Sequence, residues 1–419
     1  MNRTLKFRRY IFAAAITLAA FSFTIGQELV KSESNGTISA SEMNAMIAKA
    51  FADGSVPQTS TAVELQKVTY TSVGVNNKKV NLTGLVAWPV GGAPKGMVVY
   101  CHGTTVDRDR SPSKYKGKGE APETVEAIAA YASGGYAVVM PDYLGLGDHK
   151  AAHPYPLSKV NAASGRDIIS AARALARQKN YNIAKQLYIS GYSEGGGVAM
   201  ALTQLLQSYM NEHYQVTRSA PASGPYDLSG TTREFMLQET GEQTGFVLRL
   251  YLMSYATNYL NKQKGIKLNT FYKQALANAL GVNYRLNPTD EGVIKNIGIT
   301  TTLMRSKNLL SNVLQPAFLR DMKANRKTNP FVRMLQENDT YNWATRVPML
   351  MIYVDKDFVV SPENTTVAYN AMRKKGVSDS LMRKLELPAT FNHLTGIAPA
   401  MAKSRAFFDG GFAAVPEAR

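Results

Sequence analysis

The stretch LYISGYSEGG, residues 187–196, decides the fold of this chain. Residues 187–190 have the apolar character of a buried strand, and the glycines at 195–197 open a helical stretch. Ser193 therefore lies at a sharp strand-to-helix turn, flanked by glycines that such a turn requires. The turn would lift its hydroxyl clear of the sheet. A G-x-S-x-G match alone is weak, but this context favours a nucleophilic serine over an ordinary turn residue.

Short apolar strands alternate with amphipathic helices on both sides of this stretch, which predicts a mostly parallel, doubly wound sheet. The predicted strands are 96–101, 136–140, 186–190, 216–220, 348–354 and 381–387, and the predicted helices are 122–133, 163–177, 194–209, 363–375 and 394–408. N-terminal to these elements, the sequence pattern predicts two antiparallel strands, at 62–73 and 79–88. We expect the core to comprise residues 62–228 and 345–419.

Residues 229–344 interrupt the alternation, because they contain helical patterns (234–262, 269–280 and 311–323) and no strong strand. A helical insertion between two strands of a sheet predicts a cap, which would precede the strand at 348–354. Residues 27–61 read as a polar linker with one short helix, 41–51, which Ser39 or Ser41 would cap.

The N-terminus, residues 1–26, has the pattern of a signal peptide. Basic residues precede an apolar run at 10–25, which is shorter than the roughly 20 residues of a spanning helix. We expect cleavage near Gly26, export to the periplasm or the medium, and no stable membrane insertion. An uncleaved anchor is the alternative.

The composition is that of a globular protein, with 45% hydrophobic and 19% charged residues. The net charge of +17 comes without a run of like charges or a nucleic-acid motif, so we expect no nucleic-acid partner. Loose attraction to anionic polymers is the alternative. The single cysteine, Cys101, excludes an intramolecular disulfide and reads as a buried strand residue.

A serine nucleophile needs a histidine base and an acid that orients it. Of the five histidines, His393 alone follows the predicted cap, in a loop between the last strand and the last helix. Asp357 follows the strand at 348–354 and is the predicted acid, with Asp355 as the alternative. The chain order serine, acid, histidine is that of hydrolases with this elbow.

Two backbone amides should hold the oxyanion: Glu194, at the start of the helix after the nucleophile, and Thr104, in the loop after strand 96–101, with Thr105 as the alternative. The Glu194 side chain reads as a helix cap or, alternatively, a substrate contact. Tyr143 and Tyr192 are candidates for the substrate pocket. His102 and Asp142 are expected to brace the neighbouring loops.

No cofactor or metal is expected. The glycines at 145 and 147 lack the Lys-Ser/Thr of a phosphate loop, and the spacing of Asp148, His149 and His153 matches no metal-ligand pattern.

Several motifs together resemble the secretory lipases, a family that includes fungal lipase A. The motifs are CHGT (101–104), PDYLGLGD (141–148), HPY (153–155), GYSEGG (191–196), ENDTYNW (337–343), VPMLMIYVDKDFVVSP (347–362), VAYNAMRKKG (367–376) and NHLTG (392–396). The resemblance implies an α/β-hydrolase fold and ester hydrolysis through an acyl-enzyme, with Ser193, Asp357 and His393 as triad. Val354 departs from the glycine that is usual before the acid, and the disulfides of the fungal members are missing.

The predicted function is therefore an exported serine hydrolase that cleaves small-molecule or lipid carboxylic esters. One alternative is a peptidase of the prolyl-oligopeptidase kind, which has a similar elbow, although the N-terminal region is too short for the extra domain of those enzymes. The other alternative is a non-catalytic binding protein on a hydrolase fold, against which the complete triad argues.

Overall fold

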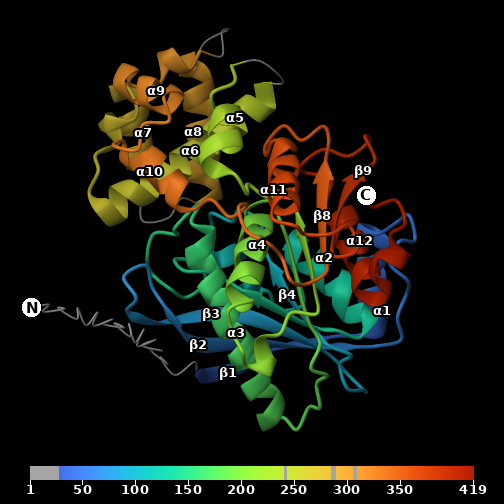
Figure 1. The fold of residues 1–419 in the computed structure, drawn as a ribbon. Helices are drawn as coiled ribbons and strands as arrows, with labels where there is room; N and C mark the ends of the chain where they lie inside the picture. The colour runs from blue at the N-terminus through green and yellow to red at the C-terminus, as the bar shows by residue number, and fades with distance from the viewer. Residues whose placement is uncertain (1–27, 120, 240–242, 285–288, 305–308) are drawn as a thin grey trace, which may run out of the picture.

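The computed structural model describes residues 28–419 apart from 120, 240–242, 285–288 and 305–308, so the predicted signal peptide lies outside the described residues. Within the described residues the strands form one nine-stranded sheet in the order β1-β2-β3-β5-β4-β6-β7-β8-β9 (Figure 1). The strands are β1 Leu29–Ile38, β2 Val63–Val73, β3 Lys79–Pro89, β4 Met97–Cys101, β5 Ala137–Pro141, β6 Leu187–Tyr192, β7 Arg218–Ala222, β8 Met349–Val354 and β9 Met382–Leu387.

The sheet is mixed and mostly parallel, which confirms the expected fold class. Strands β5, β4, β6, β7, β8 and β9 run parallel, whereas β1, β2 and β3 are antiparallel. Every residue of β4, β5 and β6 is buried, because helices cover both faces of the parallel part. The carboxyl ends of the parallel strands therefore meet at one edge, where the candidate site lies.

Two layers of helices sandwich the sheet. One face packs against α1 Ala40–Ala50, α2 Pro122–Tyr131 and α12 Ile397–Gly410. The other packs against α3 Ser158–Gln178, α4 Glu194–Leu206 and α11 Glu363–Lys374. Alternate residues of β8 enter opposite cores, Leu350 on the α12 side and Met351 on the α11 side, as the two-residue repeat of a strand requires.

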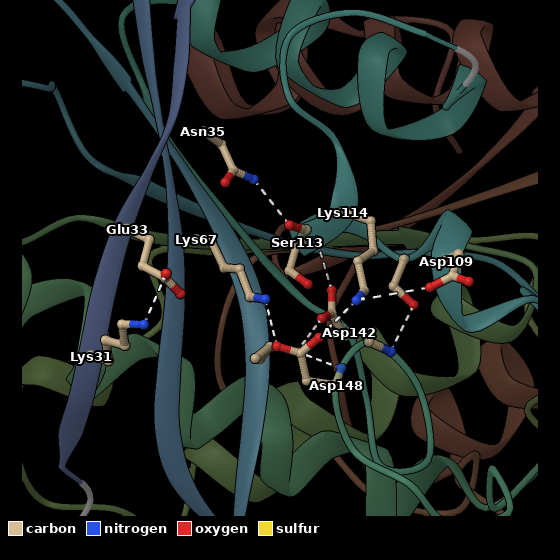
Figure 2. A network of polar contacts seen from close by, with 12 residues as sticks. Lys31, Glu33, Asn35, Lys67, Asp109, Ser113, Lys114, Asp142 and Asp148 are labelled. Atoms are coloured by element: carbon tan, nitrogen blue, oxygen red, sulfur yellow. Dashed lines mark hydrogen bonds and ion pairs between the residues drawn. The ribbon is translucent and has the colours of Figure 1, made fainter.

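The prediction of a linker over 27–61 is wrong for its first part, because residues 29–38 form edge strand β1, which pairs with β2. The side-chain amide of Asn35 donates to the carbonyls of Ser113 at 2.9 Å and Tyr115 at 2.8 Å and so joins the strand to the loop after β4 (Figure 2). Helix α1 follows directly, and Ser39 caps it in a reciprocal capping box with Glu42.

A cap of helices lies between β7 and β8 and has its own apolar core, in which Phe271, Phe318 and Phe331 pack edge to face. The single helix expected over 234–262 is two helices, and two further helices were not predicted. The cap helices are α5 Arg233–Met236, α6 Gln243–Lys264, α7 Gln274–Asn283, α8 Asp290–Met304, α9 Pro316–Lys323 and α10 Pro330–Glu337.

The cap stands over the carboxyl edge of the sheet (Figure 1). Its core continues into Val106, Tyr155 and Val359, which lie in the loops after β4, β5 and β8. Among the helices of the described residues, none is both long and apolar enough to cross a membrane.

Candidate active site

Ser193 lies on the turn between β6 and α4 in a strained backbone conformation, with φ 59° and ψ −124°. The turn is crowded: a Cβ on Gly195 would lie 1.9 Å from the carbonyl oxygen of Cys101, and one on Gly191 would lie 2.3 Å from the carbonyl oxygen of Gly195. Only glycine fits at these two positions. The strand, the turn and the first residues of the helix thus fix the backbone of Ser193.

A continuous hydrogen-bonded chain runs from this serine to the predicted acid. Ser193 Oγ lies 2.9 Å from His393 Nε2, and His393 Nδ1 lies 2.6 Å from Asp357 Oδ2. A carboxylate only accepts, so Nδ1 carries the proton and Nε2 is free to accept the serine proton. The other oxygen of Asp357 accepts from the amides of Val359 at 2.9 Å and Val360 at 2.7 Å. The loop after β8 therefore orients the carboxylate.

The two tyrosines predicted to line the pocket are buried beside the candidate catalytic groups. The Tyr192 hydroxyl donates to the carbonyl of His393 at 2.9 Å, and its ring lies 5.2 Å from the imidazole. The Tyr143 hydroxyl donates to the carbonyl of His102 at 3.1 Å. Both tyrosines thus support loops of the site, and their contact with a substrate stays a prediction.

The loop that carries Thr104 is held by Glu123, a residue that the sequence motifs did not predict. The carboxylate of Glu123, at the start of α2, accepts from the amide of Gly103 at 2.7 Å and from the Tyr100 hydroxyl at 2.7 Å. Burial raises the pKa of this carboxyl. The same loop abuts the elbow, because a Cβ on Gly195 would also lie 2.6 Å from the carbonyl oxygen of His102. The structure thus brings the loop of Thr104 next to the elbow of Ser193.

Asp142 braces the outer side of this loop, in line with its predicted role. Its Oδ2 accepts from the Thr83 hydroxyl at 2.5 Å, and its Oδ1 accepts from the amide of Ser113 at 2.8 Å (Figure 2). Nearby, Asp148 pairs with Lys67 of β2 and with Lys114. Burial raises the pKa of Asp142, although its hydrogen bonds act in the opposite direction. The network ties β2, β3 and the two loops after β4 and β5 together.

The Glu194 side chain does not cap helix α4, which corrects that expectation. It is buried, and its Oε1 lies 2.7 Å from His153 Nε2 and 3.3 Å from the side-chain amide of Asn161. Cys101 is buried as predicted, and burial raises the pKa of its thiol to about 12. A thiol with so high a pKa is not a competing nucleophile at neutral pH.

The sheet order, the elbow at the end of β6 and the cap before β8 define an α/β-hydrolase. The family model described as secretory lipase matches residues 122–234, which include α2, the elbow and β7. The chain therefore resembles the secretory lipases, as its motifs predicted. These findings support a lipase-like or esterase-like hydrolase.

Solved structures share the fold. A protein from Legionella pneumophila described as a hydrolase has a TM-score of 0.78 and 24% identity, over 92% of this chain and 98% of that one. The rice cell wall degrading esterase LipA from Xanthomonas oryzae has a TM-score of 0.77 and 23% identity, over 90% and 97%. Candida antarctica lipase A in its closed state has a TM-score of 0.62 and 16% identity, over 92% and 83%. Such identities show the fold alone. No curated protein matches the sequence.

Proposed function

We propose that this chain hydrolyses carboxylic esters through an acyl-enzyme on Ser193. The observation that carries the proposal is the chain of hydrogen bonds from Ser193 Oγ to His393 at 2.9 Å and from His393 to Asp357 at 2.6 Å. A serine hydroxyl becomes a nucleophile when a positioned base can take its proton. The family match over the elbow supports an ester as the substrate.

In the first half-reaction Ser193 Oγ attacks the ester carbonyl while His393 Nε2 accepts its proton. The oxyanion is held by the amides of Glu194 and Thr104. His393 then protonates the departing alcohol, and the acyl group remains on Ser193. In the second half-reaction water attacks the acyl-enzyme while His393 accepts its proton; the bond from the acyl carbon to Ser193 Oγ then breaks, His393 returns the proton to Oγ, and the carboxylic acid leaves. Asp357 keeps the imidazole in the required tautomer and stabilises the imidazolium throughout.

The cap supplies the apolar surroundings of this reaction. Its core meets the site through Val359 and Val360, two and three residues after the acid, and through Val106 after the loop of Thr104. An apolar acyl or alcohol group of a small-molecule or lipid ester fits such a lining, and the reaction steps need no cofactor. We infer that the cap selects the substrate.

Export is part of the proposal. Residues 1–26 have the basic start and the apolar run of a signal peptide, and the matching family is described as secretory. Expression of the full chain with its own N-terminus, followed by mass measurement of the exported protein, tests this. A mature protein beginning near residue 27 supports it, and a full-length protein retained in the cell contradicts it.

The test of the function is an assay on p-nitrophenyl esters with acyl chains of two to sixteen carbons, beside a prolyl-peptide substrate. We expect ester hydrolysis that Ser193→Ala lowers at least about 10⁴-fold. Ser190→Ala is the matched control, because Ser190 is buried on β6, three residues before Ser193, and bonds Tyr131 rather than His393. Cleavage of the peptide with no activity on any ester would overturn the proposal, as would fluorophosphonate labelling that persists in Ser193→Ala.

A further inference from the structure

A column of stacked aromatic rings joins the cap to the candidate active site. Tyr255 of cap helix α6 stacks on His153, with ring centroids 5.8 Å apart, and His153 stacks on Tyr143 at 6.0 Å. The Tyr143 ring lies 4.2 Å from that of His102, in the loop after β4. All four side chains are buried. The column therefore connects helix α6 to the loop that carries Thr104.

A tyrosine hydroxyl at the cap end of the column also reaches this loop. The Tyr255 hydroxyl donates to the carbonyl of Thr105 at 3.4 Å. The Tyr155 ring stacks on Tyr255 at 5.4 Å. One half of the proposed oxyanion hole is thus held from the cap side.

His153 reaches the other half of the oxyanion hole through Glu194. Its Nδ1 lies 2.8 Å from the carbonyl of Leu144, and its Nε2 lies 2.7 Å from Glu194 Oε1. A carbonyl only accepts, so Nδ1 carries a proton. The short Nε2–Oε1 contact then requires a second proton, on either the imidazole or the carboxyl group. This proton is enclosed, because His153 and Glu194 are only 1% and 3% exposed.

From this geometry we propose that His153 and Tyr255 are positioning residues for the oxyanion hole. His153 fixes Glu194, the first residue of α4 and the source of one oxyanion amide. Tyr255 fixes Thr105 and thereby the loop of Thr104, the source of the other amide. Because Tyr255 belongs to the cap, correct seating of the cap aligns both amides. This inference rests on the proposed function, since it concerns the oxyanion of an ester hydrolysis.

Fixed donors that are aimed at the developing charge stabilise a transition state more than they stabilise a bound substrate. Loss of either positioning residue should therefore lower kcat and leave KM almost unchanged. We expect His153→Phe, which keeps a ring in the column but removes the bond to Glu194, to lower kcat by about 100-fold. Tyr255→Phe, which removes one hydroxyl group, should lower kcat about fivefold.

Two variants serve as matched controls, and one tests the bond itself. His149→Phe changes a histidine in the same loop whose Nδ1 accepts from the amide of Gly145, and Tyr272→Phe removes a buried cap hydroxyl that bonds Thr257. Both should retain kcat within about twofold. Glu194→Gln can still bond His153, because the amide can donate to a neutral Nε2, so its kcat should stay within about fivefold of the wild type.

Inhibitor binding separates positioning from a merely structural role. A trifluoromethyl ketone adds to Ser193 and places an oxyanion between the two amides, whereas the corresponding methyl ketone binds without adding. The affinity for the trifluoromethyl ketone should fall in His153→Phe by a factor similar to that for kcat, and the affinity for the methyl ketone should not change.

Outcomes of the two proposals are distinguishable. If His153→Phe and Tyr255→Phe match their controls in kcat and in affinity for the trifluoromethyl ketone, the positioning role is wrong and ester hydrolysis stands. A parallel loss of affinity for both ketones also contradicts the positioning role. If the wild type hydrolyses no ester and binds neither ketone, the proposed function itself fails. Because Tyr255→Phe removes a single oxygen and retains every ring, it gives an answer even where His153→Phe does not fold.

Discussion

The core and the cap are built in different ways. In the core the backbone places the reactive groups: β6 pairs with β4 and β7, and the glycines of the elbow leave no space for a side chain. In the cap, helices α6 to α10 pack through aromatic and aliphatic side chains, and the backbone bridge between Tyr272 and Leu314 is an isolated one. In the proposed function, the reaction chemistry is thus encoded in short motifs and substrate selection in dispersed packing.

Polar contacts close the cap and add to the apolar and aromatic packing between the cap and the core. Ser229 donates from its amide at 2.9 Å and from its hydroxyl at 2.6 Å to the carboxylate of Asp339, which joins the two ends of the cap. Arg249 of α6 donates to the carbonyl of Phe358 at 2.8 Å, next to the predicted acid. A change at the elbow or the triad should therefore affect catalysis directly, whereas a change in the cap should affect catalysis through its contacts with the loops of the site, at Phe358 and at Thr105.

The largest effect is expected at the acid. Asp357→Asn should lower kcat roughly 10⁴-fold with little change in stability, because the amide favours the wrong histidine tautomer. Asp355→Asn is the control, since Asp355 lies two residues earlier and is exposed. It should retain wild-type kcat on p-nitrophenyl esters. A large loss in Asp355→Asn and none in Asp357→Asn would transfer the acid role to Asp355.

Glycine-to-alanine substitutions test how tightly the backbone is packed in each of the two regions. A Cβ on Gly195 would meet the Cys101 carbonyl at 1.9 Å, whereas a Cβ on Gly298, in cap helix α8, meets nothing within 4 Å. Gly195→Ala should cost more than about 3 kcal/mol of unfolding free energy and abolish activity. Gly298→Ala should add about 0.5–1 kcal/mol, because alanine favours a helix.

Urea unfolding of both glycine variants measures these changes. Equal effects at the two positions would mean that the elbow can relax and that the backbone does not place Ser193 rigidly.

Substitution of Arg249 tests the contact between cap helix α6 and the loop that carries Asp357. Burial lowers the pKa of this guanidinium to about 10, because removing its charge from water costs free energy. The hydrogen bond to the carbonyl of Phe358 offsets part of that cost. A charge-assisted hydrogen bond contributes about 1.5–3 kcal/mol, and a pKa change of one unit corresponds to about 1.4 kcal/mol. The burial cost and the gain from the hydrogen bonds to Phe358 and Gln238 thus have opposite signs and similar size.

Arg249→Met should therefore change the unfolding free energy by less than about 1 kcal/mol. It should nevertheless lower kcat several-fold, because the loop that orients Asp357 loses its anchor to the cap. Ester assays and urea unfolding measure the two quantities, with Arg320→Met, an arginine of α9, as control. A loss of stability without a change in kcat would show that Arg249 serves the packing of the cap alone.

Much of the fold followed from local sequence signals. The parallel strands are short apolar runs between amphipathic helices, and that pattern is readable because both faces of the sheet are buried. Strand β1 was missed because its sequence, LVKSESNGTI, is mostly polar and its residues are largely exposed at the sheet edge. Only pairing with β2, some thirty residues later, makes it a strand. Among the cap helices, α8 was missed because glycines and threonines interrupt its apolar pattern.

In the candidate site, too, local sequence signals reveal some residues and miss those whose partners are distant in sequence. Ser193, Asp357 and His393 could be predicted because each lies in a motif at a strand end, and the structure brings the three together. Glu123 and His153 could not be predicted, because their partners are distant in sequence. Glu123 bonds an amide 20 residues away, and His153 bonds a carboxylate 41 residues away.

Glu126 gives the smallest expected effect and again separates core from cap. It lies on core helix α2, one turn after Glu123, and burial and the charge of Glu123 raise its pKa from 4.5 to about 7. Because the folded pKa exceeds the unfolded one, the folded state binds more protons between about pH 4.5 and 7, and stability falls as pH rises through that window.

Glu126→Gln removes this titration, so the variant should be more stable than the wild type above pH 7, by on the order of 1 kcal/mol. The gain should shrink as pH falls and vanish below about pH 4.5. Glu291→Gln in cap helix α8 is the control, because Lys295 lowers the pKa of this exposed carboxyl and no gain is expected. Thermal melts from pH 4 to 9 make the comparison. A difference between Glu126→Gln and the wild type that stays constant over this range would mean that the folded state does not raise the pKa of Glu126.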